Sequence, residues 1–126
     1  DLAMTGTSMV ANARSDVMLS PEAISIFASY YLGDTNPKAP LASPVFADLS
    51  DLPPTLVLVG SKEVLLSDSI TLVEKINAAG GSAKLSVWSK MPHVFPILAA
   101  IIPEGKKAIV DMAGFLRIHL GTTRLD

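Results

Sequence analysis

Two side chains, Glu63 and His93, are the strongest candidates for chemistry in this sequence. Glu63 stands in the turn after the apolar run 55–59, and His93 stands in the loop after the alternating run Ala83–Trp88. A carboxylate that is hydrogen-bonded to an imidazole fixes the tautomer of the ring and stabilises the imidazolium formed during proton transfer. The two residue types therefore indicate general acid–base catalysis, provided that the fold brings them together.

A strand–helix–strand unit is predicted to position this pair. Residues 55–59 form an unbroken apolar run after two prolines, which is typical of a strand buried on both faces of a parallel sheet. A helix over 67–79 and the strand Ala83–Trp88 follow, and the alternation in Ala83–Trp88 suggests an edge strand. In a right-handed crossover both strands point the same way, so their following loops open on one edge of the sheet. Open α/β sheets bind ligands at that edge, where we expect Glu63 and His93 to meet.

Three helices are predicted from their end signals and apolar stripes. The first covers Pro21–Leu32, with Ser20 as cap and Gly33 as stop. The second covers 67–79, with Ser67 as cap and Gly80 as a left-handed stop. The third covers 104–120, between Pro103 and Gly121. The apolar faces expected are Ile24, Phe27, Ala28 and Tyr31 in the first; Ile70, Leu72, Val73 and Ile76 in the second; and Ile109, Met112, Ala113, Leu116 and Leu120 in the third.

The remaining segments are predicted to be irregular. Residues 1–19 have weak periodicity and room for one short helical turn. Residues 34–54 are rich in Pro, Asp and Ser, which indicates an ordered surface loop of a length often linked to function. Residues 94–102 are expected to begin with a short helix, and 122–126 form a tail.

Composition excludes several classes of function. The chain has 126 residues, enough for one small domain, and 49% of them are hydrophobic while 17% are charged. The net charge of −2 without a basic block argues against nucleic-acid binding. There is no cysteine, and the two histidines form no H-E-x-x-H pattern, so neither a disulfide nor a protein-built zinc site is expected. The longest apolar stretch, 94–102, is too short to span a bilayer and no signal-peptide pattern opens the chain, so we expect a cytoplasmic protein.

A purely structural interpretation of the two candidates stays open from the residues alone. In it Glu63 is a solvated turn residue and His93 is a loop residue between Pro92 and Phe95. Trp88, Met91 and Phe95 near the histidine are more typical of packing than of substrate contact.

Several motifs resemble one protein family in their order and separations. They are VGSKEVLLSD at 59–68 and MPHVF at 91–95, preceded by MLSPEA at 18–23, YLG at 31–33, PLASP at 40–44 and LPP at 52–54. Together they resemble the C-terminal portion of bacterial hormone-sensitive-lipase-like carboxylesterases. The resemblance covers nearly the whole chain. It implies an α/β fold, with residues 1–126 forming the C-terminal part of a single α/β-hydrolase domain of parallel strands flanked by helices.

The resemblance also implies roles for individual residues. The triad of that family runs Ser, then Asp or Glu, then His, which makes Glu63 the acid and His93 the base. Val94 stands where the family often has glycine, and Phe95 is a candidate for lining an acyl pocket. Asp68 matches a further acid of the motif and is expected to brace the turn. No cofactor or metal is implied.

The nucleophile of that family is absent from this sequence. It sits in a G-x-S-x-G motif, and the oxyanion donors come from a glycine-rich segment. The segment GTSMV at 6–10 has Val10 where glycine is required, so we assign no nucleophile here. The resemblance therefore implies that this chain is the acid and base half of a longer enzyme, inactive on its own, whose partner is the N-terminal portion of that enzyme.

The expected function is hydrolysis of short- to medium-chain carboxylic esters, as the resemblance implies. Two alternatives remain: another serine hydrolase of this fold, such as a peptidase, and a non-catalytic binding module. The resemblance further implies a homodimer through the strand Ala83–Trp88 and the final helix.

Overall fold

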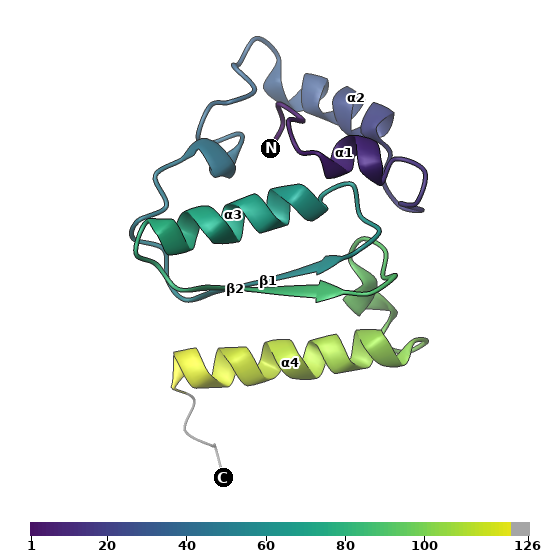
Figure 1. The fold of residues 1–126 in the computed structure, drawn as a ribbon, viewed down its shortest axis with the longest axis vertical. Helices are drawn as coiled ribbons and strands as arrows, with labels where there is room; N and C mark the ends of the chain where they lie inside the picture. The colour runs from purple at the N-terminus through teal and green to yellow at the C-terminus, as the bar shows by residue number, and fades with distance from the viewer. Residues whose placement is uncertain (122–126) are drawn as a thin grey trace. The chain divides into compact units, whose positions relative to one another are not determined.

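The computed structural model describes residues 1–121, which divide into two compact units. The unit Asp1–His93 contains the elements α1 (Ser8–Ala11), α2 (Pro21–Leu32), η1 (Pro44–Phe46), β1 (Thr55–Gly60), α3 (Leu66–Ala78) and β2 (Ala83–Trp88) (Figure 1). The unit that starts at Val94 contains the 3₁₀ helix η2 (Phe95–Leu98) and the helix α4 (Pro103–Leu120). The tail predicted over 122–126 lies outside the described residues. None of the helices within 1–121 has the length and apolar character needed to cross a membrane.

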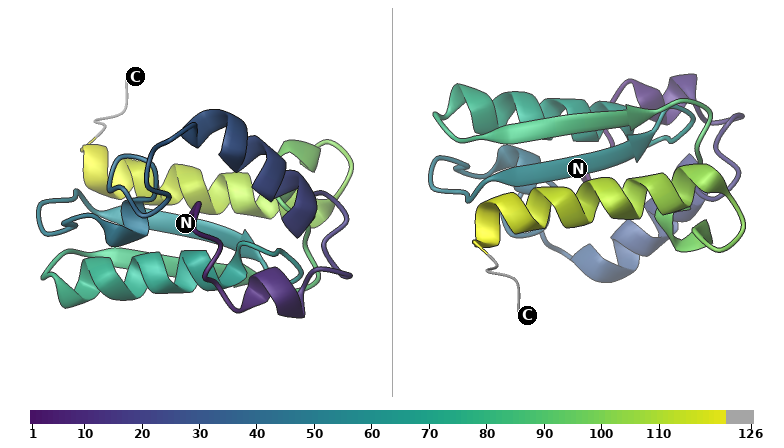
Figure 2. Two further views of the ribbon diagram at one scale, coloured as in Figure 1. Left: turned by 90° about the horizontal axis from the view of Figure 1, so that it is seen from above. Right: turned by 90° about the horizontal axis from the view of Figure 1, so that it is seen from below.

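The two strands pair in parallel, as the crossover predicts. Their register runs in step from Thr55 opposite Ala83 to Gly60 opposite Trp88, so both strands end at the same edge (Figure 2). β2 has the predicted bounds, whereas β1 extends by one residue to Gly60. The expectation that β1 is buried on both faces is wrong for this chain, in which only its last two residues are buried. The reason is that the described sheet has two strands, with α3 lying along them (Figure 1).

The helix α2 begins and ends where its end signals predict. The Ser20 hydroxyl oxygen accepts a hydrogen bond from the Ala23 N–H at 3.2 Å, and Pro21 occupies the first helical position. Gly33 ends the helix with a φ of 52°, a conformation that glycine adopts without steric cost.

The start of α3 differs from the prediction. Ser67 does not cap the helix, which begins at Leu66 and has no side-chain cap from its own N-cap residue, Leu65. A hydroxyl from a distant segment takes this role, because the Ser67 N–H donates to Ser8 Oγ at 2.9 Å. The end of the helix agrees with the prediction, since Gly80 has a φ of 87°. Of its expected apolar face, Val73 and Ile76 are buried.

The apolar faces predicted for α2 and α4 are largely uncovered in this chain. In α2 only Ala28 is buried. In α4 the buried residues are Gly105 and Ala108, whereas Ile109, Leu116 and Leu120 are exposed. The expectation that these three side chains face a core is therefore wrong here. Between Val94 and Gly121, the described part of that unit, η2 is the only other helix, and it lies at the N-terminal end of α4.

The irregular segments follow the prediction with two additions. The single helical turn expected in 1–19 is α1. The loop 34–54 contains the short 3₁₀ helix η1, and its side chains Val45 and Leu49 are buried. The short helix expected after 94 is η2, which is a 3₁₀ helix.

Candidate active site

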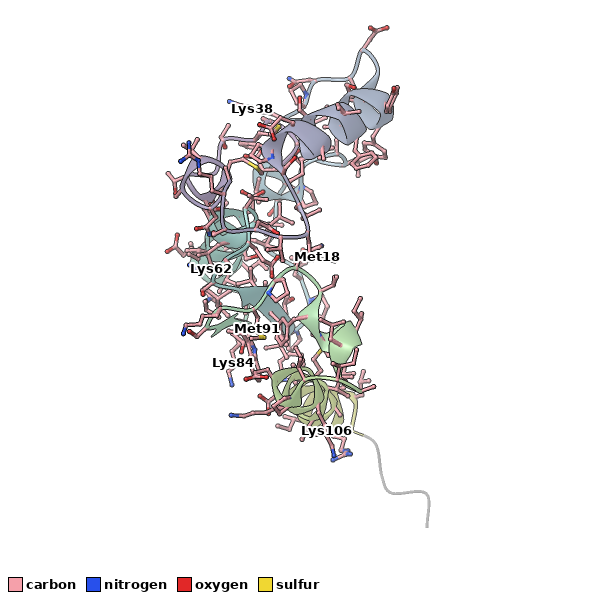
Figure 3. All side chains as sticks on the ribbon, turned by 90° about the vertical axis from the view of Figure 1, so that its right-hand side faces the viewer. Met18, Lys38, Lys62, Lys84, Met91 and Lys106 are labelled. Atoms are coloured by element: carbon pink, nitrogen blue, oxygen red, sulfur yellow. The ribbon has the colours of Figure 1, made fainter. Side chains whose placement is uncertain are left out.

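Glu63 and His93 meet at the edge where the two strands end, as the sequence predicts. Glu63 belongs to the acid turn, defined as residues 61–64 after β1, and His93 belongs to the base loop, defined as residues 89–93 after β2. His93 Nδ1 lies 2.7 Å from Glu63 Oε2. Figure 3 views this edge, with Lys62 of the acid turn and Met91 of the base loop labelled.

The carboxylate of Glu63 is buried and held at both oxygens. Only 4% of the residue is exposed, which overturns the interpretation of Glu63 as a solvated turn residue. The Gly60 N–H donates to Oε1 at 2.5 Å, while Oε2 faces His93. A buried carboxylate needs such partners because an unpaired buried charge is costly.

The acid turn and the base loop approach each other at backbone distance. A β-carbon placed on Gly60 would lie 1.9 Å from the carbonyl oxygen of Met91. The two segments are also joined by hydrogen bonds, because the Ser61 N–H donates to the Trp88 carbonyl at 2.8 Å and the Lys90 N–H donates to Ser61 Oγ at 2.9 Å. Glycine at position 60 therefore lets the loop come close enough for His93 to reach Glu63.

The imidazole of His93 is partly open to its surroundings. Its side chain is 33% exposed, against 5% for that of Glu63. With Nδ1 turned to the carboxylate, Nε2 is the ring nitrogen left for a reacting group. A ring held in this way can accept a proton at Nε2 while the carboxylate stabilises the resulting charge.

Four polar residues of the segment 8–16 contact the acid turn, and none of them was predicted from the sequence: Asn12, Asp16, Ser8 and Ser15, whose Oγ donates to the Lys62 carbonyl at 3.3 Å. Asn12 Nδ2 donates to the Glu63 carbonyl at 2.7 Å, and Asp16 Oδ2 accepts from the Val64 N–H at 2.9 Å. Ser8 Oγ donates to the Val64 carbonyl at 2.5 Å. The available signal was their spacing, because positions 8, 12 and 16 recur at helical intervals on one side of the segment.

The remaining candidates lie away from the Glu63–His93 pair or lack contact with it. Ser8 of the segment 6–10 is 6% exposed, and its hydroxyl is engaged by backbone and by Ser67. Asp68 lies in the first turn of α3, and no bond within the described residues joins it to His93. Val94 is 42% exposed with a φ of 49°, whereas Phe95 is buried at the start of η2.

Histidine and acidic side chains do not gather into a metal centre in the described part of the chain. Residues 1–121 contain no group of three or more such side chains placed to hold an ion. The pair of Glu63 and His93 provides two ligand types but no third, which is fewer than zinc sites use.

Known proteins share both the sequence and the fold of this chain. A family model described as the alpha/beta hydrolase fold matches residues 1–97. An esterase of Acinetobacter venetianus is 41% identical over 116 residues, which are 91% of this chain and 38% of the relative. An acetyl-hydrolase of Streptomyces hygroscopicus is 37% identical over 121 residues, which are 96% of this chain and 40% of the relative.

A solved structure shows the same similarity to esterases. The crystal structure of an esterase from the bacterial hormone-sensitive lipase family superposes with a TM-score of 0.92 at 48% identity, covering 94% of this chain and 40% of that one. The chain thus spans about two fifths of the length of the relatives that it matches. By sequence and by fold, the chain belongs to the α/β-hydrolase family, as its resemblance to bacterial hormone-sensitive-lipase-like esterases indicates.

Proposed function

We propose that this chain supplies the acid and the base of a serine carboxylesterase, with Glu63 as the acid and His93 as the base. The observation that carries the proposal is the 2.7 Å contact between His93 Nδ1 and Glu63 Oε2 at the edge where parallel strands end. The similarity to esterases supports the reaction type, since 41% identity extends over nearly the whole chain.

In the proposed reaction His93 Nε2 takes the proton of a serine hydroxyl as its oxygen attacks the ester carbonyl. The imidazolium then gives that proton to the leaving alcohol, and an acyl-enzyme remains. In the second half of the cycle water attacks the acyl group while His93 takes a proton from it. The imidazolium then gives that proton to the serine oxygen, which departs as the carboxylic acid is released. Glu63 stays ionised throughout and orients the ring.

The serine belongs to a part of the enzyme outside this sequence, which contains no G-x-S-x-G motif. We infer that the N-terminal portion of the same enzyme is the partner of this chain and that the chain alone is inactive. The uncovered face of α2 supports this, because Phe27, Tyr30 and Tyr31 are 68%, 83% and 71% exposed. Large apolar patches of this kind mark surfaces that another body covers.

The substrates proposed are uncharged esters with short to medium acyl chains. One relative is an acetyl-hydrolase, which supports a short acyl group. Of the two residues proposed to contact substrate, Val94 is exposed and follows His93 directly in the sequence, whereas Phe95 is buried in this chain.

Two finer proposals concern assembly and location. A homodimer through Ala83–Trp88 and the final helix is favoured by the exposure of Val87 in the strand and of Leu116 and Ile118 in the helix. A light-scattering mass equal to one subunit of the complete protein at micromolar concentration would contradict it. A location in the cytoplasm is testable by cell fractionation.

The proposed function is tested on the complete protein with p-nitrophenyl acetate and butyrate beside a panel of peptides. We expect ester hydrolysis, loss of activity in His93→Ala, and a decrease of kcat by about three to four orders of magnitude in Glu63→Gln, because the ring loses its negatively charged partner. Preferred cleavage of peptides would indicate a peptidase. Full activity of His93→Ala would reject the assignment of the base.

A further inference from the structure

The acid turn makes most of its backbone hydrogen bonds with a segment that precedes it by almost fifty residues. The bonds run from Asn12 Nδ2 to the carbonyls of Ser61 at 3.3 Å and Glu63 at 2.7 Å, from Ser15 Oγ to the Lys62 carbonyl at 3.3 Å, from the Val64 N–H to Asp16 Oδ2 at 2.9 Å, and from Ser8 Oγ to the Val64 carbonyl at 2.5 Å. Each of the four residues of the acid turn thus has a backbone group that is hydrogen-bonded to a side chain of the segment 8–16. We call Ser8, Asn12, Ser15 and Asp16 the clamp.

Backbone hydrogen bonds connect the clamp residues to one another. The Asn12 N–H donates to the Ser8 carbonyl at 2.9 Å and the Asp16 N–H donates to the Asn12 carbonyl at 3.0 Å, which continues the helical turn of α1. The second carboxylate oxygen of Asp16 accepts from the N–H groups of Met18 and Leu19 at 2.9 Å and 3.0 Å. Asp16 therefore joins two backbone segments through separate oxygens.

Apart from the clamp, bonds from Ser61 to the base loop hold the start of the acid turn, and the backbone of Glu63 itself is held by two bonds to residues that flank the turn. The Glu63 N–H donates to the Gly60 carbonyl at 3.2 Å, and the Glu63 carbonyl accepts from the Leu66 N–H at 3.3 Å. The first distance lies at the long end of the normal range for N–H···O bonds, and the second lies just beyond it. The Asn12 bond to the same Glu63 carbonyl is shorter, at 2.7 Å.

We propose that Asn12 and Asp16 are positioning residues that hold the backbone of Glu63 so that its carboxylate meets His93, an inference that rests on the proposed function. Neither side chain contacts the imidazole. Their effect passes through the peptide groups on either side of Glu63, which set the direction in which its side chain leaves the turn. Because a displacement of about 1 Å in an active site can reduce the rate about a hundredfold, a clamp of this kind matters to turnover.

The test uses the complete protein and compares Asn12→Ala and Asp16→Ala with Asp16→Asn. The asparagine variant keeps one acceptor oxygen, which can serve the Val64 N–H or the N–H groups of Met18 and Leu19 but not both, so it should recover only part of what alanine loses. Asp48→Ala is the matched control, because Asp48 also accepts from a backbone N–H two residues ahead, at 3.0 Å, but lies in an exposed turn outside the clamp. The readouts are kcat and KM for p-nitrophenyl acetate, the low-field NMR signal of the His93 Nδ1 proton, and the unfolding temperature.

We expect Asn12→Ala and Asp16→Ala each to lower kcat by about tenfold or more with KM unchanged. A tenfold decrease is what the loss of one hydrogen bond that stabilises the reactive geometry would cause. The Nδ1 proton signal should shift or broaden in both alanine variants and to a smaller extent in Asp16→Asn, whereas Asp48→Ala should match the unchanged protein. If Asp16→Ala fails to fold, Asn12→Ala decides the question, because Asn12 is only half-buried.

The inference fails if both alanine variants lower the unfolding temperature but keep the full kcat and the original NMR signal. That result would mean that the clamp only adds stability. Failure of the proposed function looks different, because His93→Ala would then remain active. If His93→Ala is inactive while the clamp variants are fully active, the role of the clamp is rejected and the proposed function stands.

Discussion

The acid turn and the base loop bring the same two side chains together by different means. The acid turn is buried around Glu63, and side chains from residues 8–16 bond its backbone. The base loop is half-exposed at His93, and its own turn closes through a long bond from the Met91 N–H to the Trp88 carbonyl at 3.4 Å. Two non-glycine residues in or next to it have positive φ, 61° at Lys90 and 49° at Val94. The position of the imidazole is therefore set by its hydrogen bond to a carboxylate whose own position is fixed by other contacts.

The largest effect on stability should come from Gly60→Ala, because the acid turn and the base loop come into close contact at this residue. The added methyl group would overlap the Met91 carbonyl oxygen, so the base loop must move away from the acid turn. We expect a loss of about 4 kcal/mol in the free energy of unfolding, measured by urea denaturation. Gly114→Ala in α4 is the control, since its new methyl group meets nothing within 4 Å and should stabilise the helix by about 1 kcal/mol. If Gly60→Ala is as stable as Gly114→Ala, the acid turn and the base loop do not approach as closely as the structure indicates.

The second largest effect on stability should come from Ser8→Ala, which changes contacts of the acid turn but not of the base loop. Ser8→Ala removes a hydroxyl that contacts the Val64 carbonyl, the Ser67 N–H and the Ser67 hydroxyl in a buried position. Because buried polar groups then lose their partner, we expect unfolding to become easier by about 2 kcal/mol in the same measurement. Ser29→Ala, whose hydroxyl bonds the Ile26 carbonyl on the exposed side of α2, should change stability much less. Equal losses in both variants would contradict the difference between buried and exposed sites.

On the base side, Val94→Gly should stabilise the protein. A β-branched residue at a φ of 49° is strained by about 1–2 kcal/mol, and glycine removes that strain at some cost in chain entropy. We expect a net gain of about 1 kcal/mol. Val110→Gly, an exposed valine inside α4, is the opposite control and should lose about 0.5 kcal/mol. A loss in both variants would mean that Val94 is not strained.

The smallest effect should follow Ser61→Ala, which removes the acceptor of the Lys90 N–H. The bond is exposed, so water replaces the hydroxyl and the loss should be about 0.5 kcal/mol. A loss several times larger would show that this bond, rather than the fit around Gly60, joins the base loop to the acid turn.

Local signals in the sequence predicted the elements and the meeting of the pair. β2 and α2 have the predicted bounds because alternation, the Ser20 cap and the Gly33 stop act over a few residues. The contact of Glu63 with His93 followed from topology, since parallel strands joined by a crossover end at one edge.

What the sequence did not reveal are contacts between segments far apart in the chain. The cap of α3 was assigned to Ser67 because Ser67 precedes an apolar stripe, whereas Ser8 provides it from a segment with weak periodicity. The exposure of Ile109 and Leu116 in α4 was missed for a related reason. An apolar stripe shows which face needs cover but not whether the same chain provides it.

The bond from the Gly60 N–H to Glu63 Oε1 has a consequence for the choice of acid. The side chain reaches back to the last amide of its own strand while its other oxygen reaches forward to the ring, so its length spans two anchors. An aspartate, shorter by one methylene, would have to give up one anchor or draw the whole turn inward. We therefore expect that replacing this glutamate by aspartate while keeping both anchors would require the turn backbone to move toward the ring.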